Sequence, residues 1–84
     1  IGQVSSFAQI TSIHEHRTKK GSMMAFCTIA DETASLQMRI MPLQYMKYNS
    51  ILTRGSYIIF RAKMTEEGYL IAEDIRTTGK ETCR

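Results

Sequence analysis

Alternating apolar and polar residues in residues 35–41 give the clearest structural signal in the sequence. Leu36, Met38 and Ile40 are apolar, and polar residues stand between them. Successive side chains of a strand point to opposite faces, so this period of two predicts a strand with one buried face. Residues 57–64 have the same period, and their predicted inward set is Ile58, Phe60, Ala62 and Met64.

Turn residues divide much of the remaining chain into segments of strand length. Residues 4–17 have a β-leaning composition and are long enough to bend or to carry a bulge. Residues 23–30 form a mostly apolar segment, and residues 69–76 follow a turn at Glu66, Glu67 and Gly68. These segments bring the predicted strands to five, and residues 78–84 are predicted to be a tail.

The single proline, Pro42, predicts a short helix after the third strand, because proline suits the first helical position. We expect this helix to end before Arg54. Its spacing predicts one buried stripe, made of Leu43, Met46, Ser50 and Ile51. Five strands with a helix between the third and fourth fit an all-β, five-stranded oligonucleotide-binding (OB) barrel of Greek-key topology. The 84 residues are predicted to form one such domain, with its core in residues 4–77.

The loop at residues 31–34 decides which side of the second strand faces the core. Directly opposed residues share a face. With a loop of about four residues, the inward pairs are Ala25 with Ile40, Cys27 with Met38, and Ile29 with Leu36. Phe26 then lies opposite Arg39 on the outer face. A loop one residue longer or shorter would reverse the second strand and make Phe26 a core residue, so the sequence leaves both placements open.

The charge balance permits a nucleic acid partner but also fits a solvated basic surface. Eleven Lys and Arg residues against eight Asp and Glu residues give a net charge of +3. No apolar run approaches the roughly 18 residues that span a membrane. Two cysteines favour reduced thiols and a cytoplasmic location. The chain begins at Ile1 without a signal-peptide pattern, which favours a piece of a larger chain.

Basic and aromatic residues gather around the second and third predicted strands. Single-stranded nucleic acid is held by aromatic faces that stack on bases and by cations that follow the phosphates. Phe26 is the candidate for stacking, beside polar groups for base edges and a basic loop that clamps the strand. The predicted nucleic-acid-binding residues are Arg17, Lys19, Lys20, Met24, Phe26, Thr28, Gln37, Arg39 and Arg61. Arg61 comes from the fourth strand and would extend the basic surface.

Candidate residues for catalysis or metal binding do not assemble into a site. The sequence contains no paired carboxylates, phosphate loop or credible triad. His14 and His16 share a face of the first strand but lack a convincing third and fourth ligand. Cys27 occupies an inward position, where a thiol is usually inert. We therefore expect no catalytic activity, metal or cofactor in this domain.

A run of motifs in the middle of the chain resembles a known family. Thr18-Lys19-Lys20-Gly21 precedes Met24-Ala25-Phe26, and the remaining matches are Ile29, Asp31, Pro42 and Tyr45. Over residues 8–77 this order is similar to the OB domain near the C-terminal end of the bacterial DNA polymerase III alpha subunit. That family usually has a glycine in the hairpin and an aromatic residue before the proline. Here the corresponding residues are Ala34 or Ser35, and Met41.

The resemblance implies a non-catalytic domain that holds single-stranded template DNA near a polymerase. The parent chain would then be a DNA-directed DNA polymerase, with other replisome subunits as possible partners. The hairpin is shared with the anticodon-binding barrels of class II aminoacyl-tRNA synthetases. In those barrels a phenylalanine and a glutamine contact bases, and they match Phe26 and Gln37. An RNA-binding module of the anticodon type and a protein-interaction module therefore stay as alternatives.

Overall fold

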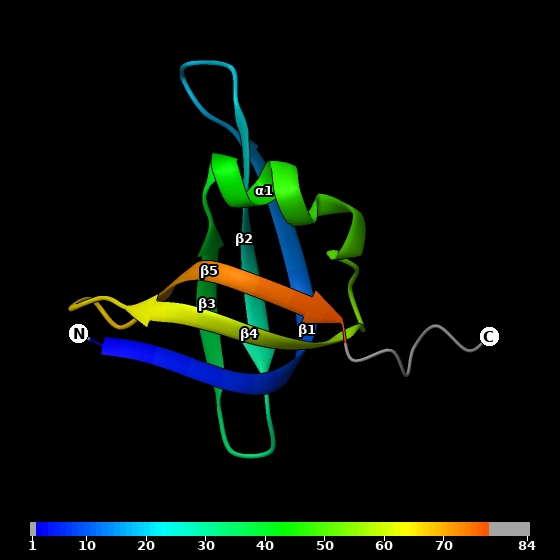
Figure 1. Ribbon diagram of the computed structural model, residues 1–84, viewed down its shortest axis with the longest axis vertical. Coiled ribbons are helices and arrows are strands. Elements are labelled where there is room, and N and C mark those ends of the chain that lie inside the picture. Colours follow the sequence, from blue (N-terminus) through cyan, green and yellow to red (C-terminus); the bar gives the residue numbers. More distant parts are fainter. Residues whose placement is uncertain (1, 78–84) are drawn as a thin grey trace.

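Five strands close into a barrel in the computed structural model, which describes residues 2–77 (Figure 1). The strands are β1 (Gly2–Arg17), β2 (Met23–Ala30), β3 (Ser35–Ile40), β4 (Tyr57–Met64) and β5 (Leu70–Thr77). The helix α1 (Pro42–Tyr48) and the 3₁₀ turn η1 (Asn49–Ile51) lie between β3 and β4. The predicted OB architecture is confirmed, and β2 and β4 have the predicted bounds. The predicted tail lies outside the described residues.

The long strand β1 closes the barrel because it pairs with two different strands. Its first half, from Gly2 to Gln9, pairs with β4, and its second half pairs with β2 up to Arg17. The register shifts between Ile10 and Ser12, so the predicted bend occurs as a bulge. The ring is completed by a parallel contact between β3 and β5, in the order β1-β2-β3-β5-β4. β4 therefore lies on the other side of the barrel from β2 and β3.

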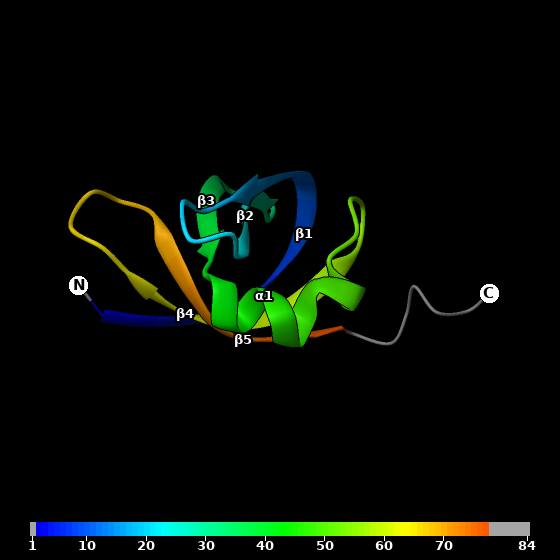
Figure 2. The same ribbon diagram turned by 90° about the horizontal axis from the view of Figure 1, so that it is seen from above.

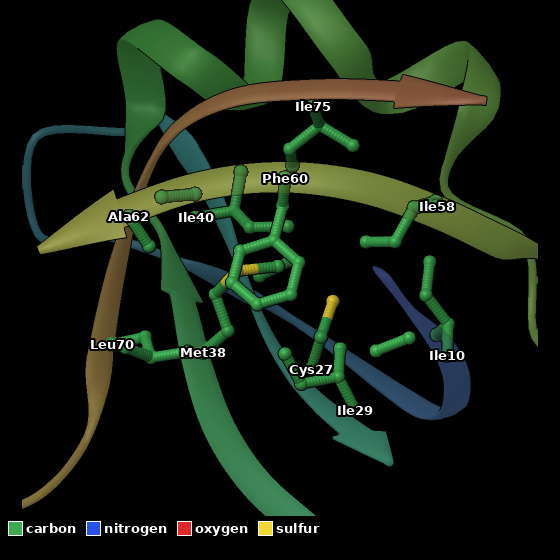
Figure 3. Close-up of a cluster of buried hydrophobic side chains, with 13 residues drawn as sticks. Ile10, Cys27, Ile29, Met38, Ile40, Ile58, Phe60, Ala62, Leu70 and Ile75 are labelled. Atoms are coloured by element: carbon green, nitrogen blue, oxygen red, sulfur yellow. The ribbon is translucent and has the colours of Figure 1, made fainter. Parts of the chain in front are cut away.

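Inward side chains from all five strands fill the barrel (Figure 3). The register of β2 against β3 is the predicted one, with Cys27 opposite Met38 and Phe26 opposite Arg39. The largest fully buried side chains are Ile10, Cys27, Met38, Ile40, Ile58, Leu70 and Ile75. The alternation predicted for β4 is confirmed, because Ile58, Phe60 and Ala62 are buried. One face of each strand thus forms the core and leaves the other free for binding.

The stripe predicted for α1 is wrong, although the helix begins at Pro42 as predicted. Leu43 and Met46 are 68% and 77% exposed, and Ser50 is also exposed.

Tyr45 and Tyr48 pack against the core instead, together with Ile51, the one predicted stripe member that does so. The Tyr48 hydroxyl donates to Asp74 Oδ1 at 2.8 Å, and the Tyr45 hydroxyl donates to Glu15. These bonds raise the pKa of both phenols. The two hydrogen bonds hold the tyrosine face of this short helix inward. The three-residue spacing of Leu43 and Met46 does not by itself decide which face is buried.

In the view from above, α1 lies between the arc of β1, β2 and β3 and the strand β5 (Figure 2), in agreement with its contacts to β2 and β5. It covers one end of the barrel. No helix in residues 2–77 is long and apolar enough to cross a membrane.

The buried and exposed apolar residues on either side of Pro42 give a direct test of this packing. Ile40 is fully buried and Leu43 is 68% exposed. We expect Ile40→Ala to lower the free energy of unfolding by about 2–5 kcal/mol, because it leaves a cavity. Leu43→Ala should change it by less than about 0.5 kcal/mol, as surface substitutions do. Urea denaturation followed by circular dichroism measures both, and equal losses would contradict the observed orientation of α1.

Candidate nucleic-acid interface

Paired strands align outward side chains in rows across β1, β2 and β3. Phe26 lies opposite His14 of β1 on one side and Arg39 of β3 on the other. The neighbouring row contains Thr28 and Gln37. Directly opposed residues share a face, so these side chains form one surface, which we call the outer face of β2 and β3. Phe26 is partly exposed and lies outside the core cluster, which excludes the alternative that it is a core residue.

Arg39 lies between two aromatic rings at the centre of this face. Its guanidinium carbon, Cζ, is 5.5 Å from the ring centre of Phe26 and 4.2 Å from that of Tyr69. A cation within about 6 Å of an aromatic ring is attracted to its face. His16 approaches Phe26 from β1, with ring centres 6.0 Å apart. Phe26 and Arg39 thus lie close to each other and to a second ring, rather than merely on one side of the sheet.

A shallow cavity of about 300 Å³ accompanies this cluster. Its lining residues are Phe26, Gln37, Met38, Arg39 and Tyr69. We call it the Arg39 cleft. It offers two aromatic rings, one cation and one amide within one depression. Such a combination suits a planar base attached to a phosphate chain.

Tyr69 is a member of the cleft that the sequence analysis missed. It directly precedes β5, and the parallel pairing of Leu70 with Met38 brings it beside β3. No local pattern around residue 69 indicates which strand will be its neighbour. The signal is the closure of the barrel, which becomes visible only when the OB topology is applied to the strand order.

Thr28 and Gln37 form a polar pair next to Phe26. The Gln37 amide Nε2 donates to Thr28 Oγ1 at 3.4 Å. Gln37 is exposed and Thr28 is half-buried. The Gln37 carbonyl oxygen is an acceptor and the Thr28 hydroxyl is a donor, so the pair can read a base edge from one side of the cleft.

The loop between β1 and β2 carries the predicted basic clamp. It projects beyond the barrel at the top of Figure 1. The Thr18 amide donates to Ser22 O at 2.7 Å, and Gly21 adopts a φ of 92°, which favours glycine. Arg17 Nη1 donates to Gly21 O at 3.3 Å, so this side chain also stabilises the loop.

Lys19 and Lys20 are exposed at the tip of the loop. The ion pairs found within residues 2–77 are Arg61 with Glu73 and Arg76 with Asp74, so neither lysine takes part in one. Arg39 is also absent from both of these ion pairs. Three cations on or near the outer face therefore keep their charge available for phosphates.

Two residues predicted for this site are not brought into it. Met24 has the outward parity of Phe26, but it is only 8% exposed and offers little surface to a base. Arg61 pairs with Ser5 and Asp74, and its Nε lies 3.5 Å from Glu73 Oε1. Closure of the barrel places β4 between β1 and β5, so Arg61 is remote from the β2–β3 pair and its charge is balanced locally.

Cys27 lies on the opposite side of β2 from this face, in the core. Burial raises the pKa of its thiol to about 11. The reactive thiolate is therefore scarce at neutral pH. Within the described part of the chain, no group of three or more His, Cys, Asp or Glu side chains is placed to hold a metal ion.

Comparison with known proteins assigns this architecture to a class. The chain belongs to the OB-fold nucleic acid binding domain family, which matches residues 2–77. It is 31% identical over 61 residues to DNA polymerase III subunit alpha of Bacillus subtilis (strain 168). That match covers 73% of this chain and 6% of the polymerase subunit, so the chain spans a small part of that relative. The resemblance found in the sequence is confirmed.

Solved structures support the same fold. A mitochondrial single-stranded DNA binding protein from S. cerevisiae, Rim1, superposes with a TM-score of 0.75 at 14% identity, covering 92% of this chain and 93% of that one. The second OB-fold domain of replication protein A from Methanococcus maripaludis gives 0.62 at 15% identity, covering 90% and 83%. At such identities the likeness concerns the fold alone.

The environment of Cys27 can be tested with a thiol reagent in a Cys83→Ser variant, where Cys27 is the remaining cysteine. We expect alkylation by iodoacetamide at pH 7.5 to be slow, because the thiol is buried and its pKa is about 11. Addition of denaturing urea should accelerate it at least about tenfold, since a free thiol has a pKa of about 8.5. Equal rates in folded and unfolded protein would show that β2 does not hold Cys27 in the core.

Proposed function

We propose that this chain is a non-catalytic domain that binds single-stranded DNA within a bacterial replicative DNA polymerase III alpha subunit. The observation that carries the proposal is the Arg39 cleft, where Arg39 lies close to the rings of both Phe26 and Tyr69. The 31% identity to a polymerase III alpha subunit supports the parent protein. The domain would form part of a longer cytoplasmic chain and keep template strand near an active site located elsewhere.

The cleft is suited to a flexible strand because its aromatic rings and its cation recognise features common to all nucleotides. Phe26 provides a ring on which a base stacks, an interaction of about 1–3 kcal/mol per base. Arg39 is already oriented by Tyr69 at 4.2 Å, so less side-chain freedom is lost when it meets a phosphate. Gln37 and Thr28 add hydrogen bonds to a base edge or sugar.

The loop lysines extend the path from the cleft toward the end of the barrel. Lys19 and Lys20 are compact charges on flexible stems, which contact phosphates without demanding one geometry. Glu66 and Glu67 lie in the turn that precedes Tyr69, and they oppose a phosphate chain on that side. Binding by this domain alone should therefore be weak and sensitive to salt.

An RNA-binding role is the second candidate, and the Gln37–Thr28 pair is compatible with it. Its donor and acceptor groups, next to a stacking ring, fit base reading as well as sequence-independent binding. A fluorescence competition between a tRNA anticodon stem-loop and DNA of the same length and loop sequence separates the two. Preference for the DNA supports the polymerase role, and preference for the RNA would replace it with the anticodon type.

Phe26 should dominate binding to single-stranded DNA. We expect Phe26→Ala to weaken the binding of fluorescein-labelled oligo-dT by about 5-fold to 150-fold, which corresponds to the loss of one stacked base. Tyr57→Ala is the matched control, since Tyr57 is an exposed aromatic residue on β4 that does not line the Arg39 cleft. Fluorescence anisotropy measures both affinities. Equal effects of the two substitutions would remove Phe26 from the site.

The loop lysines should set the salt dependence of binding. A single strand loses affinity with a slope of about −0.7 in log K against log salt for each neutralised phosphate. We expect Lys19→Ala with Lys20→Ala to reduce the magnitude of that slope by about 1.4. Lys47→Ala with Lys63→Ala removes the same charge from α1 and β4 and should leave the slope nearly unchanged. Equal slopes in the two double variants would exclude a specific role of the loop.

A further inference from the structure

A second exposed aromatic cluster lies on β1 and β4, outside the proposed DNA path. The rings of Phe7 and Tyr57 are stacked, with centres 5.7 Å apart and an interplanar angle of 6°. Phe7 is 49% exposed and Tyr57 is 41% exposed, and Ile59 beside them is 50% exposed. Ile59 lies directly opposite Phe7 in the sheet. Three large apolar side chains in one place mark a surface that gains stability when it is covered.

These rings form one wall of a cavity of about 530 Å³ that extends to the loop between β2 and β3. The polar side chains in the lining are Gln9, Asp31, Glu32 and Thr33. Two of these four are carboxylates, and the described lining contains no Lys, Arg or His. The cavity thus combines aromatic rings with net negative charge, which is the opposite of the Arg39 cleft.

Hydrogen bonds within the lining leave acceptors rather than donors for a ligand. Gln9 Nε2 donates to Gly55 O at 3.1 Å, so the Gln9 carbonyl oxygen is left as an acceptor. Thr33 Oγ1 donates to Asp31 Oδ1 at 3.0 Å. The backbone amides of Thr33 and Ala34 also donate to Asp31 Oδ1, which lowers the pKa of this carboxyl and keeps it ionised.

We propose that this cavity binds an arginine side chain carried by a segment of a partner protein. A guanidinium is planar and stacks on aromatic rings, and its five donors match carboxylate and amide acceptors. A phosphate chain is repelled here, because Asp31 and Glu32 line the cavity without a compensating cation. This cavity therefore has a chemistry distinct from that of the outer face of β2 and β3.

The apolar surroundings favour a protein segment over a free small cation. A smaller cavity of about 120 Å³ shares Ala8 and Asp31 with the first one, and its apolar lining includes Val4, Leu36 and Phe60. With the exposed Ile59, it offers apolar surface beyond the reach of one guanidinium group. A segment with apolar residues beside its arginine would cover both cavities, while DNA occupies the other side of the barrel.

Two capped peptides that differ by one charge test this site. The first is Ac-Gly-Leu-Arg-Leu-Gly-NH₂, and the second has citrulline, which has a similar shape but no charge, in place of arginine. In ¹⁵N–¹H NMR titrations of the 84-residue chain, we expect the arginine peptide to shift amides of residues 7–9, 31–33 and 57. The citrulline peptide should bind at least about tenfold more weakly, since charge-assisted hydrogen bonds are lost. Equal binding, no binding, or shifts at Phe26 and Arg39 would overturn the proposal.

Substitutions on the two sides of the barrel separate this proposal from the proposed function. Glu32→Gln changes an exposed loop side chain and Phe7→Ser removes one ring, and each should weaken the arginine peptide at least threefold, or about 0.65 kcal/mol. Phe26→Ala should leave peptide affinity unchanged, whether or not it weakens oligo-dT. If oligo-dT shifts the cavity amides, or if the chain dimerises through them in sedimentation, the cavity has another occupant and the proposal fails.

Discussion

The turn at residues 31–34 fixes the register of β2 against β3, and the rest of the structure depends on that register. Asp31 Oδ1 accepts the Thr33 amide at 2.8 Å and the Ala34 amide at 3.0 Å, and the Asp31 amide donates to Ala34 O. With four residues in the turn, Cys27 faces the core and Phe26 faces outward. A shift by one residue would exchange these roles and abolish the outer face.

Elements with a local cause were predictable from the sequence. The alternation in β4 and β3 reflects burial on one face only, and it defined their inward residues. The apolar set of β3 places Phe26 outside for a turn of four residues, and the structure settles the turn length that the sequence left open. Pro42 marked the start of α1 for a reason confined to its own backbone. In each case the information lies within a few residues of the element.

Features that depend on which strands become neighbours were not predictable in the same way. Tyr69 joins the cleft because β5 lies parallel to β3, and Arg61 is excluded from it because β4 lies across the barrel. The orientation of α1 is set by hydrogen bonds from its tyrosines to Glu15 and Asp74, which are distant in sequence. The burial of Met24 could not be predicted from its position in the strand. Alternation along a strand shows which face a side chain is on, but not whether other residues cover it there.

The barrel thus has a cationic, aromatic cleft on the outer face of β2 and β3, and a separate cavity with an aromatic wall from β1 and β4 and carboxylates from the β2–β3 loop. The central claim is that the first of these holds single-stranded DNA. An NMR titration of ¹⁵N-labelled protein with a short oligo-dT tests it most directly. The account predicts that amides of β2, β3, Tyr69 and the loop at Lys19 shift together, while those of Phe7 and Tyr57 stay in place. Shifts confined to β1 and β4, or none at low salt, would contradict it.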